Sequence, residues 1–269
     1  MEQGCSSVTK TKEIEIRGIF EMRLNQRKYQ KSYLRNIRIF DIFCGDGENQ
    51  VVGETFLGSP FEIINAIEST KVYENKHVDF VASDNRQVAI ELLLKRVNRK
   101  DHPFKVNVLK MPADESIDLV KSYLSSSNAN HAILLVDPNG PGVIPFQQLN
   151  DLRRYSSRLD VIINISESAI NRIKGCGITK NKNWWADYEN FEAILCELRR
   201  GYKWGWLRDC IKGDKQRWRL IVLSGWAKPK SGWEKQGLYE ITSDQDIIDM
   251  LDGRFRHDIK NSSIGPMFA

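Results

Sequence analysis

Four acidic residues each stand at the end of a short segment rich in β-branched and other hydrophobic residues. They are Asp41, Asp84, Asp114 and Asp137. In open α/β sheets a ligand binds outside the carboxyl ends of the strands, so acids in these positions can accept hydrogen bonds from its hydroxyl and amino groups. Asp84 is placed to accept from two ribose hydroxyls, whereas Asp114 either accepts from an adenine amino group or caps the next helix. Four acids in this order are typical of a site for S-adenosylmethionine.

Two glycines follow the first of these acids in the sequence FDIFCGDGENQ. Gly45 and Gly47 allow the backbone to turn tightly and to approach a ligand closely, and the next helix offers free amide groups. A tight turn after a buried strand is the simpler alternative. Gln50 stands where a dinucleotide fingerprint has its third glycine, and no Gly-Lys-Ser or Gly-Lys-Thr sequence occurs, so nicotinamide cofactors and ATP are disfavoured.

The fourth segment, ILLVDPNGPG, ends in residues that are common in turns. This turn follows the fourth of the strands that end in an acid, so it is expected to face the methyl acceptor. Asp137, Pro138 and Asn139 are the predicted catalytic residues. Methyl transfer requires in-line positioning and an acceptor for the proton of the target amine, and the carboxylate of Asp137 can supply that acceptor. Asn164 and Ser166, at the end of a fifth segment, are expected to line the same cleft.

A second candidate site lies in the basic segment 175–235, which contains all seven tryptophans. Aromatic rings beside cationic side chains bind single strands and flipped bases. Trp204, Trp206 and Trp233, flanked by Lys, Gly and Arg, are the tryptophans expected to be exposed and to contact a substrate. The alternative is that the tryptophans fill a core around the last strands. This is the expectation above all for Trp184, Trp185, Trp218 and Trp226.

Short hydrophobic segments alternate with amphipathic ones along most of the chain, and this alternation predicts the elements that position the candidate residues. Strands are predicted over residues 37–43, 78–82, 105–109, 132–136, 161–165 and 219–223, and helices over residues 10–34, 60–68, 87–97, 115–124, 146–155 and 188–199. Strands alternating with helices favour a parallel sheet covered on both faces. The predicted fold is a Rossmann-like α/β fold, and its resemblance to the class I methyltransferase fold implies a mainly parallel seven-stranded sheet.

Three regions are predicted along the chain. Residues 1–36 form a basic helical N-terminal extension, with nine Lys or Arg against four Glu in residues 1–38. Residues 37–253 form the methyltransferase domain, with the Trp-rich basic segment as an insertion and a polar loop over residues 48–58. Residues 254–269 have few side chains to bury and are expected to be a disordered tail.

Composition excludes several classes of protein. The 269 residues are 41% hydrophobic and 28% charged, which is typical of a globular protein that buries a sizeable core. No hydrophobic run approaches the length of a membrane span and the first residues lack a secretion signal, so a cytoplasmic location without membrane contact is expected. The five cysteines form no Cys-x-x-Cys pair and only four histidines occur, so neither a metal site nor a disulfide framework is indicated.

Three stretches resemble class I S-adenosylmethionine-dependent methyltransferases, and most closely the three-Cys-motif partner protein (TcmP) family. The stretch DIFCGDGENQVVGETFLGSP is similar to the family's acid, aromatic, Gly-x-Gly, polar loop and Gly-Ser-Pro pattern. AILLVDPNGPGVIPFQQL and LDVIINISESAINR resemble its later strands. The resemblance spans about residues 37–172 and implies that Phe43, Ser59 and Asn85 join the acids and glycines in binding S-adenosylmethionine, and that Arg172 contacts the substrate.

Two positions depart from the family pattern. Asp46 stands where the family usually has proline, which adds a carboxylate near the expected methionine end of the cofactor; it either holds the cofactor's ammonium or repels its carboxylate. Asn139 replaces the aromatic residue of the catalytic tetrapeptide, which in base amino-methyltransferases stacks on the extruded base. Either another ring stacks on the base, or the site has changed its substrate or lost its activity.

The resulting hypothesis is a methyltransferase that acts on a nitrogen of a DNA or RNA base. The resemblance implies a mobile-element or defence context and a second protein subunit as a partner. The net charge of +5 and the two basic segments favour a nucleic acid as a partner, although a solvated charged face is a common alternative. Two other hypotheses stay open: a non-catalytic nucleic-acid-binding subunit that retains the fold, and a methyltransferase of small molecules or proteins.

Overall fold

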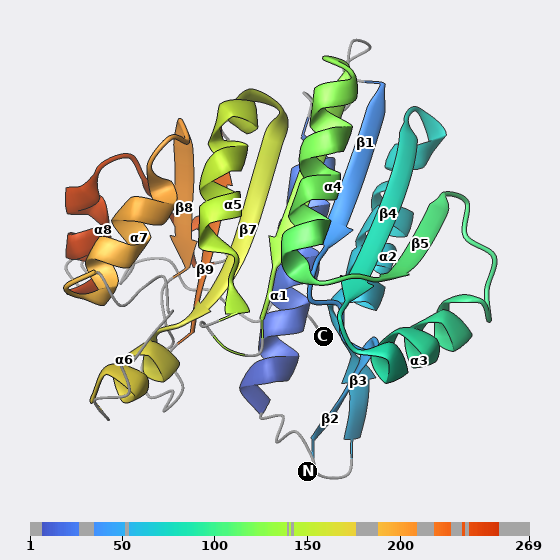
Figure 1. Cartoon of the computed structure of the whole chain (residues 1–269), viewed down its shortest axis with the longest axis horizontal. Helices are drawn as coiled ribbons and strands as arrows, with labels where there is room; N and C mark the ends of the chain where they lie inside the picture. Colours follow the sequence, from blue (N-terminus) through green and yellow to red (C-terminus); the bar gives the residue numbers. More distant parts are fainter. Residues whose placement is uncertain are drawn as a thin grey trace.

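The chain folds around one eight-stranded sheet with helices on both faces (Figure 1). The computed structural model describes residues 7–26, 35–51, 54–138, 140, 143–175, 188–208, 218–226, 233–234 and 237–252. The strand order is β10-β8-β9-β7-β6-β1-β4-β5. Their bounds are β1 (Asn36–Asp41), β4 (His77–Asp84), β5 (Lys105–Lys110), β6 (Asn130–Val136), β7 (Leu159–Ser166), β8 (Trp204–Arg208), β9 (Trp218–Ser224) and β10 (Leu238–Ile241).

The central strands are parallel. Strand β1 pairs in parallel with β4 on one side and with β6 on the other, and β5 and β7 extend the parallel part outward. The remaining strands β9, β8 and β10 join by antiparallel pairing. The chain order reverses between β1 and β6, which is where open α/β sheets bind their ligands, outside the carboxyl ends of the strands. This edge is called the carboxyl edge below, and the opposite one the amino edge.

The Rossmann-like α/β class predicted from the sequence is confirmed. All six predicted strands are present, and in the described residues the sheet has one strand more than the seven expected. The strands that were not predicted as segments are β8 and β10. The residues of β4, β6 and β7 are almost all buried because helices cover both faces of the sheet, as expected for parallel strands.

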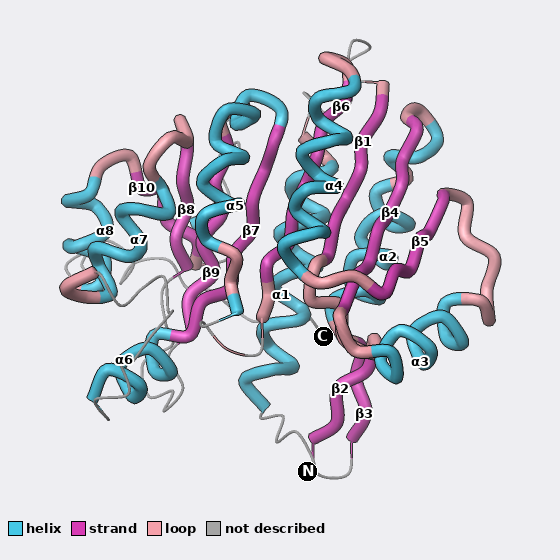
Figure 2. Tube along the Cα trace, in the orientation of Figure 1, coloured by secondary structure: helices cyan, strands magenta, loops and turns pink. Residues whose placement is uncertain are grey.

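Helices lie on both faces of the sheet (Figure 2), and a hydrophobic core lies on each face. Helices α1 (Ser7–Leu24), α2 (Ser59–Thr70) and α3 (Gln87–Val97) pack into the first core, and α2 is followed by the short helix η1 (Val72–Glu74). The second core is covered by α4 (Ala113–Ser126), α5 (Phe146–Asp151) continued by η3 (Leu152–Arg158), α6 (Glu167–Gly175), α7 (Phe191–Arg199) and α8 (Asp244–Leu251). In the described part of the chain, no helix is long and apolar enough to span a membrane.

Helix α1 is an integral part of the first core. Its apolar residues Ile16, Ile19, Phe20 and Leu24 are at most 1% exposed and pack with β1 and α2. The helix ends at Leu24, ten residues before the predicted end, and residues 27–34 lie outside the described residues. The predicted N-terminal extension therefore contains a core helix, because its apolar stripe faces the sheet.

The segment predicted as a polar loop over residues 48–58 is a β-hairpin. Strands β2 (Glu48–Val51) and β3 (Glu54–Leu57) pair antiparallel, and Gly58 N donates a hydrogen bond to Gly47 O at 2.9 Å where the hairpin returns to the sheet. Figure 1 shows this hairpin and the first turns of α1 projecting beyond the carboxyl edge. An ion pair of 3.0 Å between Lys10 and Glu54 joins the two elements.

The described parts of the Trp-rich segment 175–235 do not form a separate insertion. Helix α7 packs in the second core, and β8 and β9 belong to the main sheet. Most of the tryptophans in this segment therefore lie on or beside strands. Residues 176–187, 209–217, 227–232 and 235–236 lie outside the described residues, as does the predicted tail.

Candidate active site

Three of the four predicted acids end three adjacent strands. Asp41 and Asp84 are the last residues of β1 and β4, and Asp137 directly follows β6. Because the strand order is β4-β1-β6, these carboxyl groups follow one another along the carboxyl edge. They are 0%, 6% and 9% exposed, respectively, so all three are buried acids. Asp114 lies farther out, exposed in the first turn of α4, where Pro112 occupies the N-cap position and makes no side-chain cap.

Asp41 is the most deeply buried of the three. Its Oδ2 accepts a hydrogen bond of 2.7 Å from Ser59 Oγ, and its Oδ1 accepts one of 3.3 Å from Phe43 N. Burial raises the pKa of Asp41 to about 7, against the effect of these two donors. Ser59 opens α2 with Pro60 at the next position, which suits a helix start. The predicted cofactor residues Asp41, Phe43 and Ser59 are thus brought into one cluster.

Asp137 is held by two side chains from other elements. Its Oδ1 accepts a hydrogen bond of 2.7 Å from Asn164 Nδ2 of β7, and its Oδ2 accepts one of 2.6 Å from Lys12 Nζ of α1. Asn164 was expected in this cleft, and Ser166 lies two residues farther along the same strand. Pro138 is half-buried beside Asp137, whereas Asn139 lies outside the described residues. Each carboxylate oxygen of Asp137 keeps a second acceptor position for a substrate proton.

Sequence reasoning missed Lys12 and Glu13. Glu13 is buried, with its side chain 5% exposed, and Lys12 is half-buried, with its side chain 16% exposed. Burial lowers the pKa of Lys12, but the carboxylates of Asp137 and Glu13 outweigh this effect and raise it above its usual range. Burial, together with nearby Asp137 and Asp41, raises the pKa of Glu13 to about 8 although Lys12 opposes the shift.

A helical pattern could have located these two residues. Lys12 and Glu13 precede the buried Ile16 by four and three positions, so they lie on the same face of α1 as its apolar stripe. The basic composition of residues 1–38 instead favoured a solvated surface for a polyanion. The two charges remain largely buried because they meet the carboxyl edge, where Asp137 and Asn49 give them polar partners.

The carboxylate of Asp84 accepts hydrogen bonds from Gly45 and Arg86. Gly45 N donates to Asp84 Oδ2 at 3.1 Å, and Arg86 donates from its backbone and its guanidinium at 2.9–3.0 Å. Burial raises the pKa of Asp84, but Arg86 outweighs it and holds this pKa below the usual value. The Arg86 side chain is 45% exposed and can move into solvent, and Asn85 is exposed beside it. Ribose hydroxyls would take the acceptor positions that Arg86 now fills.

Asp46 has a cationic partner within the chain. Its carboxylate pairs with Arg96 of α3 at 3.1 Å, and the same guanidinium pairs with Glu48 at 2.6 Å. The departure from the family pattern at this position is therefore neutralised by a helix of the chain itself, and neither effect expected of Asp46 on the cofactor follows from this arrangement.

The two glycines of the first turn have different surroundings. Gly45 has a φ of +60° and Gly47 a φ of +83°, a region that side chains rarely adopt. A Cβ on Gly45 would meet only the Arg86 guanidinium, at 3.7 Å, so the backbone there is open to a ligand. A Cβ on Gly47 would lie 2.6 Å from the Phe61 ring and 2.8 Å from Leu93. The absence of a side chain at Gly45 leaves space for a ligand beside the backbone, and its absence at Gly47 allows Phe61 and Leu93 to pack closely.

We expect Gly47→Ala to lower the free energy of unfolding by about 2–5 kcal/mol, since overpacking and a left-handed backbone add their costs. Urea denaturation measures the change. Gly45→Ala is the matched control because it has the same backbone strain without the clash, and it should cost about 1–2 kcal/mol. Equal losses in the two variants would show that packing against Phe61 and Leu93 is unimportant.

The tryptophans predicted to contact a substrate do not face the carboxyl edge. Trp206 and Trp233 are 2% and 4% exposed, and their rings contact each other with centroids 5.0 Å apart. Trp204 is half-buried at the start of β8, paired with Ser224, which places it at the amino edge. The prediction that these three are exposed beside the acceptor is wrong, because β8 and its neighbours use the rings to fill the first core.

Two basic residues accompany the carboxyl edge. Arg172 is exposed on α6, which leaves the end of β7. Arg208, at the end of β8, pairs with Glu15 of α1, and its guanidinium lies 4.3 Å from the centroid of the Trp218 ring. Arg172 is therefore the predicted substrate residue that remains accessible on this side of the sheet.

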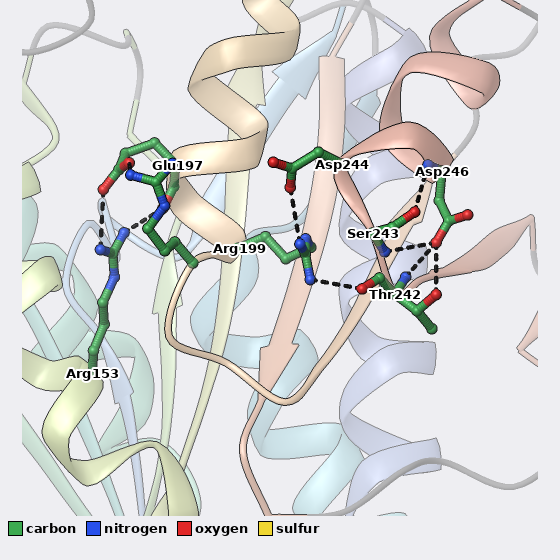
Figure 3. A network of polar contacts seen from close by, with 8 residues as sticks. Arg153, Glu197, Arg199, Thr242, Ser243, Asp244 and Asp246 are labelled. Carbon is green, nitrogen blue, oxygen red and sulfur yellow. Dashed lines mark hydrogen bonds and ion pairs between the residues drawn. The ribbon is translucent and has the colours of Figure 1, made fainter.

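A separate polar network lies at the amino edge, where α7 and α8 meet (Figure 3). Glu197 binds Arg153 at 3.0 Å, and Arg199 binds Asp244 at 2.9 Å. Ser243 and Asp246 form a reciprocal capping box at the start of α8. A shallow hollow of about 610 Å³ between the two helices contains none of the carboxyl-edge acids. This network secures the end of the sheet and is remote from the candidate site.

The residues at the carboxyl edge fit S-adenosylmethionine. Gly45 leaves its backbone open, Asp84 can accept from ribose hydroxyls, and buried carboxylates suit the cationic methionine end. One carboxylate oxygen, Glu13 Oε2, is buried without a hydrogen-bond partner among the described residues. Within the same described part of the chain, no three His, Cys, Asp or Glu side chains are arranged to hold a metal ion.

Comparison with known proteins shows similarity in fold. No protein-family model matches the chain, and no curated protein matches its sequence. The chain resembles the solved structure of protein LPL1258 from Legionella pneumophila Philadelphia 1, with a TM-score of 0.51 and 13% identity over 80% of this chain and 86% of that one. Weaker likenesses are to a human methyltransferase 10 domain containing protein (TM-score 0.48, 15% identity, 80% and 82% covered) and to the METTL16 MTase domain (0.46, 14%, 80% and 82%).

Proposed function

We propose that the chain transfers a methyl group from S-adenosylmethionine to a nitrogen of a base in DNA or RNA. The observation that carries this proposal is the row of buried acids Asp84, Asp41 and Asp137 along three adjacent strand ends, beside the open turn at Gly45. The row lies where the chain order reverses, the usual ligand position in such sheets. The motifs shared with three-Cys-motif partner proteins support the same function.

In this proposal, different acids contact the cofactor and the methyl acceptor. The cofactor supplies an electrophilic methyl group. Asp84 would accept hydrogen bonds from its ribose, and the open turn at Gly45 lets its backbone approach closely. Asp137 would orient the target amine and take up its proton. Lys12 and Asn164 each donate a hydrogen bond to one oxygen of Asp137. The carboxylate that accepts the proton is therefore held in position before a substrate binds.

Basic residues and the acceptor motif support a nucleic-acid substrate. Residues 199–235 carry eleven Lys or Arg against three acids, and the net charge is +5. Arg172 is an exposed cation on the side of the acceptor. The buried tryptophans Trp206 and Trp233 do not supply the stacking ring, which must come from another residue or from a partner chain.

A non-catalytic subunit is the second candidate function. Asp84 and Asp137 are already engaged by Arg86 and Lys12, and Asn139 lacks the aromatic ring of the family motif. In that case the fold would bind nucleic acid and another protein without transferring a methyl group. A partner protein that co-purifies with a chain devoid of transferase activity would favour this alternative.

A methyl-transfer screen tests the proposal. The chain is incubated with S-adenosylmethionine carrying a tritiated methyl group and with DNA, RNA and protein fractions. We expect label in one nucleic-acid fraction, on the bases and not on the sugar or the phosphate. Label in the protein fraction alone would contradict the nucleic-acid substrate, and label in no fraction would favour the non-catalytic subunit.

We expect Asp84→Ala to weaken binding of S-adenosylmethionine by about 100-fold or more, since hydrogen bonds to a charged group contribute about 1.5–3 kcal/mol each and two are lost. Isothermal titration calorimetry measures the dissociation constant. The control is Asp118→Ala, which removes an exposed acid of α4 with no assigned role and should leave the affinity unchanged. An unchanged affinity in Asp84→Ala would contradict the assigned role.

A further inference from the structure

Glu13 is a buried carboxylate whose hydrogen bonds are incomplete. Its side chain is only 5% exposed, yet Oε2 has no hydrogen-bond partner among the described residues. The other oxygen, Oε1, accepts from Asn49 Nδ2 at 3.3 Å and lies 3.5 Å from Lys12 Nζ. A buried oxygen without a donor costs about 1–3 kcal/mol or more when it is charged, so a donor that arrives with a ligand would remove this cost.

The charge balance around Glu13 favours a cation as that donor. Three carboxylates, those of Glu13, Asp41 and Asp137, interact with one another and with a single ammonium, Lys12. When all are ionised, this cluster has an excess of negative charge. The like charges and burial raise the pKa of Glu13 to about 8, and a second cation would relieve the repulsion.

The position of Glu13 corresponds to one part of the cofactor. Along the edge, Asp84 stands at the ribose side and Asp137 at the acceptor side, with Asp41 between them. The methyl group travels from a sulfonium that joins the ribose to the methionine chain, so the methionine chain must lie near the middle of this row. Lys12 Nζ lies 3.5 Å from Glu13 Oε1 and 2.6 Å from Asp137 Oδ2, so Glu13 stands beside the part of the row between Asp41 and Asp137.

Helix α1 is fixed at both ends, which holds Glu13 in place. Arg23, near the end of α1, pairs with Asp160 at the amino edge, and Lys12 pairs with Asp137 at the carboxyl edge. The eleven steps from Lys12 to Arg23 span about 16 Å of helix, and the six steps from His131, which lies beside Asp160, to Asp137 span roughly 20 Å of extended chain. The helix thus crosses the sheet and delivers its first turns to the site.

We infer that Glu13 of α1 binds the ammonium group of the cofactor's methionine end, with Oε2 as the acceptor. This inference rests on the proposed function. It adds a cofactor-binding residue that lies outside the strands and the loops that follow them. A carboxylate at the start of a core helix makes α1 a wall of the cofactor site. Binding of the cofactor then completes the hydrogen bonds of Glu13 and balances the charge of the cluster.

The test compares ligands with and without the ammonium. S-adenosylmethionine and S-adenosylhomocysteine carry it, whereas 5′-methylthioadenosine keeps the nucleoside and lacks the amino-acid part. Glu13→Gln should weaken binding of the first two by about 10- to 100-fold and leave 5′-methylthioadenosine within about twofold, as expected for the loss of one hydrogen bond to a charged group. Glu21→Gln, on the same helix and paired with Arg17, is the control and should change none of the three.

Calorimetry gives the dissociation constants, and circular dichroism checks that the variant folds. Equal affinity of Glu13→Gln and the unchanged chain for S-adenosylmethionine would overturn the inference. So would a similar loss for all three ligands, because it would show that Glu13 supports the fold of the site. If the unchanged chain bound none of the ligands, the proposed function itself would be overturned, which is a different result from a chain that binds all three without using Glu13.

Discussion

Asp160→Ala should lower the free energy of unfolding by about 3–5 kcal/mol, because it leaves a buried arginine without its partner. Asp160, in β7, and Arg23, in α1, are both 0% exposed. Arg23 Nε donates to Asp160 Oδ2 at 2.6 Å, and Arg23 Nη2 also donates to Ser224 Oγ at 2.5 Å. Burial opposes ionisation of Asp160, but Arg23 outweighs it and holds the pKa of Asp160 well below its usual range.

Urea denaturation followed by circular dichroism measures this loss. The double variant Arg23→Met with Asp160→Leu is the matched control, since replacing both members of a buried pair by apolar residues is often close to neutral. We expect it to recover most of the stability. A loss below about 1 kcal/mol in Asp160→Ala, the range of an exposed pair, would contradict the view that this ion pair anchors α1.

Asp137→Asn should lower the rate of methyl transfer by about 100- to 10,000-fold, which is the usual contribution of a positioned general base. The asparagine keeps the shape of the side chain and its acceptor for Asn164, but it cannot take up the proton of the target amine. Lys12, which donates to Asp137 at 2.6 Å, would also lose its main partner. The affinity for S-adenosylmethionine should stay within a few fold.

Single-turnover transfer of a tritiated methyl group and calorimetry of the same protein separate the two effects. Asp46→Asn is the matched control, because it removes the same charge from a carboxylate that pairs with Arg96 on α3. It should leave the transfer rate nearly unchanged. A normal rate in Asp137→Asn, or a rate reduced only through weaker cofactor binding, would remove Asp137 from the acceptor site.

The central strands were predictable because burial on both faces leaves a clear trace in the sequence. Segments such as 132–136 are continuous runs of hydrophobic residues, and β6 contains this run. The hairpin β2–β3 and the strand β8 were not predictable in the same way. ENQV and ETFL are short and mostly polar, and WGWLR has a glycine between two tryptophans and reads as a basic aromatic segment.

The same distinction applies to the candidate site. Asp41, Asp84 and Asp137 could be predicted because the carboxyl ends of parallel strands meet at one edge of the sheet. A residue at the end of a predicted strand is therefore placed at that edge. Lys12 and Glu13 were missed because their role depends on how a helix packs across the sheet, which is a tertiary property. The exposure of Trp206 and Trp233 was misjudged for the same reason, since basic neighbours in the sequence do not show which face of a strand meets the core.

We propose that the carboxyl edge of the sheet binds S-adenosylmethionine through Asp84 and its neighbouring acids. Calorimetric titration of the chain with S-adenosylmethionine, beside Asp84→Ala, tests it most directly because no acceptor or partner is needed. We expect one saturable site in the unchanged chain and a loss of affinity of about 100-fold or more in the variant. No binding to the unchanged chain, or the same affinity in both proteins, would contradict it.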